Sequence, residues 1–401
     1  MKSVTDHRED AVCPASFNLA DYVLGADEGD ADKIALSVLS LSGAERWSYR
    51  RLRTSVASMA HALVDAGLGP GDVLMLRLGH SPLFPISFLA AAWAGILPLP
   101  TSQHLTEDEV EAIAGAVLPK AVLFQDGVSL PRSPILRIRV HSLRLDGPTV
   151  PARLGSAERP GYILCTSGTS GTPRIVTHAH RAIWARRFMV DGWTGLLPSD
   201  RMLHAGAFNW SYTLGTGLLD PWTIGATALV LDQEANLDAL PLLAKRHDAS
   251  ILAGVPGIFR RLLKSPLPSL PKLRHALSAG EKLPESLRQR WRDTVGTDIH
   301  EAFGQTECST FISGNPSRPA PNGSLGYAQP GRAVAIIDNG HPVDLGEMGE
   351  IAVSSDDPGL ALATRPETEK WVGTGDLGQM SEDGAIYYLG RGDDMLTAGG
   401  F

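Results

Sequence analysis

Short, strand-like apolar runs separated by segments of helix length recur along most of this chain. The strand-like runs cover residues 73–78, 96–99, 119–125, 201–208, 225–232, 249–256 and 273–283. The helical patterns between them cover residues 48–72, 86–94, 235–248 and 284–295. Strands that alternate with helices form βαβ units, whose strands lie parallel. The sequence therefore predicts an α/β fold with mostly parallel sheets.

The pattern of predicted secondary structure changes from about residue 323. Short strand-like runs bounded by turn residues follow one another there, as in "GRAVAIID", "GEIAVSS" and "GAIYYLGR". Such a pattern is typical of a small all-β unit. We expect a first α/β subdomain over 1–160, a second over 161–322 that carries the functional loops, and a small β-barrel-like subdomain over 323–401.

Bulk properties exclude several classes of protein. The 401 residues are 43% hydrophobic and 20% charged, with a formal net charge of −8, which is ordinary for a globular enzyme and unlike a nucleic-acid-binding surface. The charged N-terminus lacks the apolar segment of a secretion signal, and three scattered cysteines form no disulfide framework. Prolines interrupt the uncharged stretch 82–100, which leaves too short a helix to cross a membrane. We expect a cytoplasmic enzyme with no membrane span and no nucleic-acid partner.

A loop rich in glycine and hydroxyl groups, "TSGTSGTPR", follows the apolar run 162–165. Glycines let backbone amides turn toward an anion, while hydroxyls and an arginine add further donors. The residues concerned are Thr166, Ser167, Gly168, Thr169, Ser170, Gly171 and Arg174. A flexible surface linker is the alternative interpretation. The loop has neither the ending of a P-loop nor the glycine spacing of a dinucleotide fingerprint, so it indicates another kind of polyphosphate site.

Two further stretches carry chemistry that suits a nucleotide. In "HEAFGQTECS", Glu307 follows Gln305 and Thr306, and a carboxylate there is suited to hold Mg²⁺ against phosphate oxygens. Asp376 and Arg391 lie fifteen residues apart, which predicts that they face each other at the ends of adjacent strands. An aspartate in that place can accept hydrogen bonds from two ribose hydroxyls.

Taken in this order, the motifs resemble those of the adenylate-forming enzymes, which include acyl- and aryl-CoA ligases, luciferases and the adenylation domains of peptide synthetases. The stretches that carry the resemblance span almost the whole chain: "SYRRL", "GLGPGD", "FLAAAWAGILPLP", "TSGTSGTPR", "LSAGEKL", "EAFGQTE", "TGDLG" and "GRGDDMLTAGG". The resemblance implies that a carboxylate attacks the α-phosphorus of ATP, that pyrophosphate leaves, and that a thiol then takes the acyl group from the adenylate.

The resemblance also implies roles for individual residues. The glycine-rich loop would hold the pyrophosphate end of ATP, Thr306 would reach the α-phosphate and Glu307 would carry Mg²⁺. Asp376 and Arg391 would bind the ribose, and Asp393 would be the hinge of a mobile C-terminal domain. The adenine slot would be formed by Gly280, Glu281, Ala302, Phe303, Gly304 and Gln305, with Phe303 against the base.

Two features depart from the family pattern. The phosphate loop ends in Pro-Arg at Arg174, where the family has Pro-Lys, so the charge is kept but its geometry changes. The chain also stops eight residues after Asp393, before the mobile domain that supplies a lysine for adenylation. We therefore expect an N-terminal fragment that keeps the binding sites without the full catalytic set.

The expected acid is a flat aromatic carboxylate. The pocket stretch "HAGAFNWSYTLGTG" has no acidic residue before Asp220 that could pair with an ammonium group, and it resembles benzoate-type aryl-CoA ligases. The predicted pocket residues are His204, Phe208, Trp210, Ser211, Tyr212, Ala279, Gly280, Gly304, Thr310 and Phe311. The aromatic rings could equally be core, and His204 could be a core histidine. Ser211, Tyr212 and Thr310 are candidates to bind a polar ring substituent. His178 and His180 have no third ligand nearby that would indicate a metal site.

The sequence thus predicts an aryl-CoA ligase that uses ATP, Mg²⁺ and coenzyme A. Two alternatives stay open: an adenylation enzyme that loads an aryl acid onto the phosphopantetheine of an acyl carrier protein, and a non-catalytic protein that binds acyl-adenylates. Self-association as a homodimer is also left open.

Overall fold

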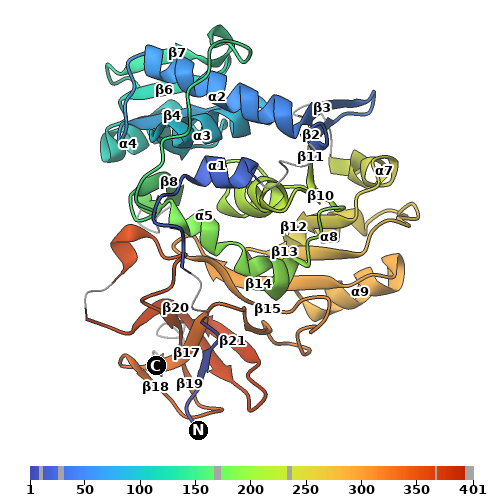
Figure 1. Ribbon diagram of the computed structural model, residues 1–401. Helices are drawn as coiled ribbons and strands as arrows, with labels where there is room; N and C mark the ends of the chain where they lie inside the picture. Colours follow the sequence, from blue (N-terminus) through green and yellow to red (C-terminus); the bar gives the residue numbers. More distant parts are fainter. Residues whose placement is uncertain (9–11, 26–30, 167–172, 233–236, 366–367, 393–401) are drawn as a thin grey trace.

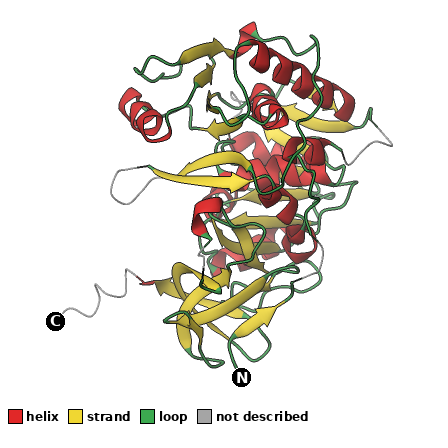
Figure 2. Ribbon diagram, turned by 60° about the vertical axis from the view of Figure 1, so that its left-hand side comes forward, coloured by secondary structure: helices red, strands yellow, loops and turns green. Residues whose placement is uncertain are grey.

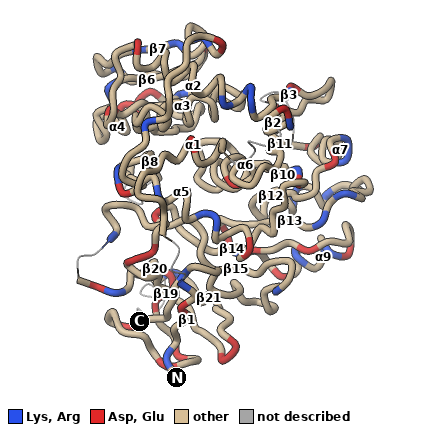
Figure 3. The backbone as a smooth tube through the Cα atoms, in the orientation of Figure 1, with Lys and Arg blue, Asp and Glu red and all other residues tan. Residues whose placement is uncertain are grey.

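The computed structural model describes residues 1–8, 12–25, 31–166, 173–232, 237–365 and 368–392. Its elements form three stacked parts, with the N-terminal helices and sheet at the top of Figure 1, a large sheet in the middle and a small β-subdomain at the bottom. Charged residues of both signs are interspersed along the chain (Figure 3).

The first part is a parallel sheet in the order β5-β4-β6-β7. Its strands are β4 (Val73–Arg77), β5 (Leu97–Pro100), β6 (Ala121–Phe124) and β7 (Leu136–Arg139), followed by the 3-10 turn η1 (Val140–Ser142). Its helices are α2 (Tyr49–Asp65), α3 (Leu83–Ala94) and α4 (Glu107–Val117). Ser48 caps α2 by accepting from the Arg51 amide, as its sequence position predicts.

Helix α3 is apolar on every side and lies in the core, where such a helix is stable. It begins at Leu83, three residues before the predicted start. Pro85 lies in its first turn, where a missing amide hydrogen breaks no bond of the helix. Over the described residues, none of the helices combines the length and apolar character that crossing a membrane requires.

The second part is a mixed sheet in the order β16-β15-β14-β13-β12-β10-β11-β2-β3. From β14 to β2 all neighbouring strands are parallel, which confirms the α/β prediction. The strands are β2 (Ile34–Leu39), β3 (Ala44–Ser48), β10 (Arg201–His204), β11 (Thr227–Leu231), β12 (Ile251–Gly254), β13 (His275–Ala279), β14 (Ile299–Gln305), β15 (Ser309–Ser313) and β16 (Tyr327–Ala328).

The helices of this part connect or cover the parallel strands. They are α1 (Leu19–Leu24), α5 (Arg181–Ala185), α6 (Asp220–Thr223), α7 (Leu240–Arg246), α8 (Pro256–Leu262) and α9 (Glu285–Val295), with π-helical turns η2 (Val190–Thr194) and η3 (Thr213–Leu219) and the 3-10 turn η4 (Leu237–Ala239). An antiparallel hairpin of β8 (Pro160–Thr166) and β9 (Arg174–Ala179) stands beside the sheet and projects from the body (Figure 2).

The third part is an antiparallel sheet in the order β1-β17-β19-β20-β21, with β18 paired to β17. Its elements are β1 (Val4–Asp6), β17 (Ala333–Asp338), β18 (His341–Pro342), β19 (Met348–Ser354), the 3-10 turn η5 (Leu362–Thr364), β20 (Trp371–Met380) and β21 (Ile386–Arg391). The N-terminal strand β1 pairs with β17, and β2 pairs with β11 of the large sheet. Segments within 1–160 therefore contribute strands to each of the three parts, because strand pairing is not set by order along the chain.

We predict that Phe88→Ala costs about 3–5 kcal/mol of stability, because it opens a cavity where the buried ring of α3 meets Tyr162 of β8 edge-on at 5.8 Å. Denaturant unfolding followed by circular dichroism measures this. The control is Val64→Ala, an exposed position of α2, for which a change within about 0.5 kcal/mol is expected. Equal stability of the two variants would contradict the core position of Phe88.

Candidate functional site

A cavity of about 640 Å³ opens at the carboxyl ends of β13 and β14, where they face the small β-subdomain. Ligands of open α/β sheets bind at this edge, because the connecting loops and exposed backbone groups meet there. The sequence-predicted residues on its wall are Thr166, Arg174, Gly280, Glu281, Ala302, Phe303, Gly304, Gln305, Glu307, Asp376 and Arg391. Residues from four distant parts of the chain thus meet around one space.

The hairpin supplies the end of the cavity predicted to hold phosphate. Thr166 and Arg174 are register partners at its tip, and both lie on the cavity wall. The predicted loop residues between them (Ser167, Gly168, Thr169, Ser170 and Gly171) lie outside the described residues, as does the predicted hinge Asp393. Arg174 is 62% exposed and contacts Glu307, with 2.9 Å between Nη2 and Oε1. The phosphate-loop arginine and the predicted metal ligand are therefore paired.

Glu307 fits the part of a magnesium ligand. Its side chain is 11% exposed on the cavity wall, and its backbone carbonyl accepts from the Ala361 amide at 2.7 Å, which holds the turn after β14 in place. In the described part of the chain, no group of three or more His, Cys, Asp or Glu side chains could hold a metal ion. Mg²⁺ is commonly bound by one or two carboxylates together with substrate phosphates, so a single glutamate suits it.

The small subdomain supplies the end predicted to bind ribose. Asp376 of β20 and Arg391 of β21 are register partners, as their spacing predicts, and Arg391 Nη1 lies 3.4 Å from Asp376 Oδ1. Asp376 is 6% exposed, and its backbone amide donates to Thr374 Oγ1 at 3.1 Å. The aspartate is thus held rigidly, and its carboxylate faces the cavity as an acceptor.

The wall between these ends is narrow and partly aromatic. Phe303 lies on it together with Tyr388 of β21, their ring centroids 6.4 Å apart. Gly304 is required because a Cβ there would lie 2.0 Å from the Ser309 carbonyl oxygen, so the backbone of β14 can pass close to β15 only as glycine. Tyr388, Lys282 and Thr374 lie on the same wall. Lys282 and Thr374 belong to the motifs "LSAGEKL" and "TGDLG" but were not predicted as site residues, and Tyr388 lies outside the motifs.

The predicted acid-pocket residues do not line one common cavity, unlike most of the predicted nucleotide-site residues. Gly280 and Gly304 line the large cavity, whereas Ser211 and Thr306 line a second, small cavity behind the turn of residues 305–307. Phe208 is buried against His80, with stacked rings 4.2 Å apart, and Phe311 is fully buried in the core of the small subdomain. These two rings serve as core, the alternative that the sequence had left open.

The remaining predicted residues lie around the end of β10 and near β15. His204 is buried against Tyr212, and burial lowers its pKa to about 3. The Tyr212 hydroxyl donates to the Leu277 carbonyl at 3.1 Å, so it already has a partner. Trp210 is 45% exposed and lies beside Gly280. Ala279 is buried in β13, and Thr310 Oγ1 lies 3.5 Å from Gln329 Nε2.

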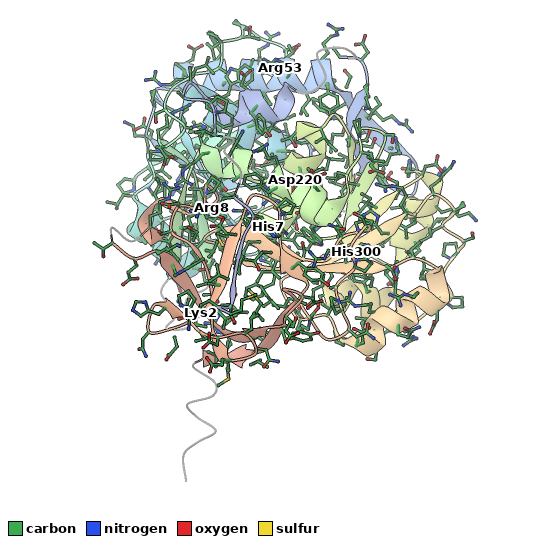
Figure 4. The ribbon with its side chains drawn as sticks, turned by 60° about the horizontal axis from the view of Figure 1, so that its bottom comes forward. Lys2, His7, Arg8, Arg53, Asp220 and His300 are labelled. Carbon is green, nitrogen blue, oxygen red and sulfur yellow. The ribbon has the colours of Figure 1, made fainter. Side chains whose placement is uncertain are left out.

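Sequence reasoning missed a buried ion pair between Arg186 and Asp220. Arg186 donates from Nε and Nη2 to the two carboxylate oxygens, both at 2.7 Å. It also donates to Ser309 Oγ and to Thr216 Oγ1. Asp220 lies deep inside the body (Figure 4). A Cβ at Gly215 would lie 2.2 Å from the guanidinium, so this glycine makes room for the arginine.

Comparison with known proteins agrees with this geometry. The family described as AMP-binding enzyme matches residues 26–361. The chain belongs to this family, and thus to the adenylate-forming superfamily. The structure also resembles that of a benzoate CoA ligase from Burkholderia xenovorans LB400, with a TM-score of 0.81, 25% identity, and coverage of 95% of this chain and 81% of that one. The α/β fold with its antiparallel small sheet is the fold of these enzymes.

Two curated relatives are similar to this protein over almost the whole chain. A 3-hydroxybenzoate–CoA/4-hydroxybenzoate–CoA ligase of Thauera aromatica is 27% identical over 430 residues, covering 96% of this chain and 79% of the relative. The human mitochondrial acyl-coenzyme A synthetase ACSM2A is 29% identical over 436 residues, covering 97% and 75%. CoA ligases of this family use ATP, Mg²⁺ and coenzyme A.

We predict that Glu307→Gln abolishes most of the gain in ATP affinity that Mg²⁺ provides, because the anionic metal ligand is lost. Isothermal titration with ATP, with and without Mg²⁺, measures this, and affinity for AMP without metal should stay within about twofold. An ATP affinity that responds to Mg²⁺ as in the unaltered protein would show that Glu307 holds no metal.

Asp376→Asn should weaken AMP binding roughly tenfold to hundredfold, because hydrogen bonds to an ionised acceptor contribute about 1.5–3 kcal/mol. Fluorescence or calorimetric titration with AMP measures the change. The control is Asp383→Asn, a fully exposed aspartate in the turn after β20 that binds Ser381. If both variants bind AMP equally well, Asp376 does not hold the nucleotide.

Proposed function

We propose that this protein activates an aromatic carboxylic acid with ATP to an acyl-adenylate and transfers the acyl group to the thiol of coenzyme A. The observation that carries the proposal is the single cavity in which Arg174, Glu307 and Asp376 converge at the carboxyl edge of the parallel strands. The cation suits the phosphates of ATP, the metal-ligating carboxylate suits the bound Mg²⁺, and the sugar acceptor suits the ribose.

The charges of the site suit attack at the α-phosphorus. Arg174 and the amides of the hairpin tip would bind the departing pyrophosphate, and Thr306 would donate to the α-phosphate. Mg²⁺, when bound to Glu307, would neutralise negative charge on the phosphate oxygens. The Arg174–Glu307 ion pair would then open, because Glu307 turns to the metal and Arg174 to the phosphates. The pair is largely exposed on the arginine side, so breaking it costs about 1 kcal/mol or less.

An aromatic acid is favoured over an amino acid. Asp220 is the first carboxylate after the pocket stretch, and both of its oxygens are taken by Arg186, so it is not available to an ammonium group. The curated relatives named for hydroxybenzoate and benzoate support an aryl substrate. They also support coenzyme A as the thiol acceptor, with a carrier-protein phosphopantetheine as the alternative.

We predict that benzoate or a hydroxy- or aminobenzoate is used at least tenfold better, in kcat/KM, than octanoate or phenylalanine. Formation of the acyl-adenylate by the full-length enzyme is followed by pyrophosphate release with each acid, and thioester formation is then compared with coenzyme A and with a phosphopantetheinylated carrier protein. A tenfold preference for octanoate or phenylalanine would overturn the aromatic assignment, while pyrophosphate release would still support adenylation.

A further inference from the structure

The turn of residues 305–307 separates the large nucleotide cavity from the small cavity behind it. Gln305 and Glu307 line the large nucleotide cavity, whereas Thr306, between them, lines the small one. Thr306 is the residue that we expect to contact the α-phosphate, so the acid that attacks this phosphorus would lie near the small cavity. Its volume is about 20 Å³, room for a group the size of one water molecule and too little for a ring.

His178 of β9 lines this cavity and carries an unused acceptor. The side chain is 2% exposed, and Nε2 lies 2.8 Å from the backbone carbonyl oxygen of Thr306. Because a carbonyl only accepts, Nε2 must carry the hydrogen. Burial lowers the pKa of His178 to about 4, so the ring is neutral at pH 7 and Nδ1 carries a lone pair. Nδ1 is buried and has no hydrogen-bond partner within the described residues.

The surroundings hold the His178 ring in place. Tyr162 stacks on it, with centroids 4.7 Å apart and an angle of 11° between the planes. Leu164, Ile183 and Leu214 make up much of the remaining wall. A buried acceptor without a partner costs free energy, and a ligand or a water that donates to it would remove this cost.

The charge of the cavity restricts what that donor can be. Arg186 also lines it, but its charge is balanced by Asp220, and each of its nitrogens has a partner in Asp220, Thr216 or Ser309. The pair is neutral overall, so it offers no unpaired charge to a second carboxylate or to an ammonium group. A neutral hydroxyl or aromatic amino group fits both the size and the charge.

We propose that the small cavity receives a hydroxyl or amino substituent of the acid, and that His178 Nδ1 accepts a hydrogen bond from it. The inference rests on the proposed function and adds a recognition element for one class of substrate. When an acid with such a donor binds, His178 Nδ1 accepts a hydrogen bond, whereas the unsubstituted acid leaves Nδ1 without a donor.

The test is the variant His178→Gln. The amide nitrogen of glutamine can still donate to the Thr306 carbonyl, but no acceptor remains at the position of Nδ1. In the unaltered protein we expect one of the 2-, 3- and 4-hydroxybenzoates or 2-aminobenzoate to exceed benzoate at least tenfold in kcat/KM and in affinity measured by titration with AMP present. In His178→Gln this preference, the ratio of kcat/KM for the substituted acid to kcat/KM for benzoate, should fall at least fivefold.

The matched control is His275→Gln. Buried His275 donates from Nε2 to the Thr194 carbonyl at the same 2.8 Å, but it lies outside both cavities, so the preference should be unchanged. Should His178→Gln fail to fold, Ser211→Val, which narrows the cavity without altering His178, should lower the same preference.

The outcomes separate this inference from the proposed function. Equal use of substituted and unsubstituted acids by the unaltered protein, or a preference that survives both variants, would mean that only a structural water fills the cavity and would overturn the inference. The pair 2-hydroxybutanoate and butanoate is run alongside. If these two aliphatic acids are used better than the aromatic acids, the aromatic class alone is wrong. The effect of His178→Gln on the preference for 2-hydroxybutanoate over butanoate would then decide the inference.

Discussion

The site depends on hydrogen bonds that hold the loop between β19 and β20 against the large sheet. Arg181, buried in α5, donates to the carbonyls of Pro358 and Leu360 and pairs with Glu158 at 2.8 Å. The Ala361 amide in turn donates to the Glu307 carbonyl. Through these contacts the small subdomain is attached to the turn after β14. The wall carrying Asp376 therefore faces the wall carrying Glu307 across the cavity.

Buried and exposed ion pairs have different roles in this molecule. The Arg186–Asp220 pair is removed from solvent, so losing one partner would leave an uncompensated charge at a cost of about 3–5 kcal/mol. Arg186 of this pair also donates to Ser309 Oγ, at the start of β15. The Arg174–Glu307 pair lies at the cavity surface and costs little to break. Because it is buried, the Arg186–Asp220 pair is costly to break, whereas the Arg174–Glu307 pair, exposed on the arginine side, can exchange its partners at little cost.

The predicted positions of nucleotide-site residues agree with the structure where a residue lies at the end of a strand, and their roles stay predictions. Asp376 and Arg391 are register partners, and Glu307 follows directly after β14. The acid pocket was harder to predict. An aromatic side chain in a strand-rich segment looks the same in sequence whether it faces a ligand or packs in the core, so Phe208 and Phe311 could not be told from pocket residues. Tyr388 had no motif around it, and only folding brings it to Phe303.

The sequence by itself determined the α/β fold, because alternating apolar periods dictate which segments form strands and helices, and it determined the family through motifs whose spacing is local. Only the tertiary structure decided which charges are available to a ligand. Arg186 and Asp220 are far apart in the chain, as are His178 and Thr306, and no local pattern signals either contact. Long-range packing brings these pairs together, and the burial that results lowers the pKa of His178 and leaves its Nδ1 without a partner among the described residues.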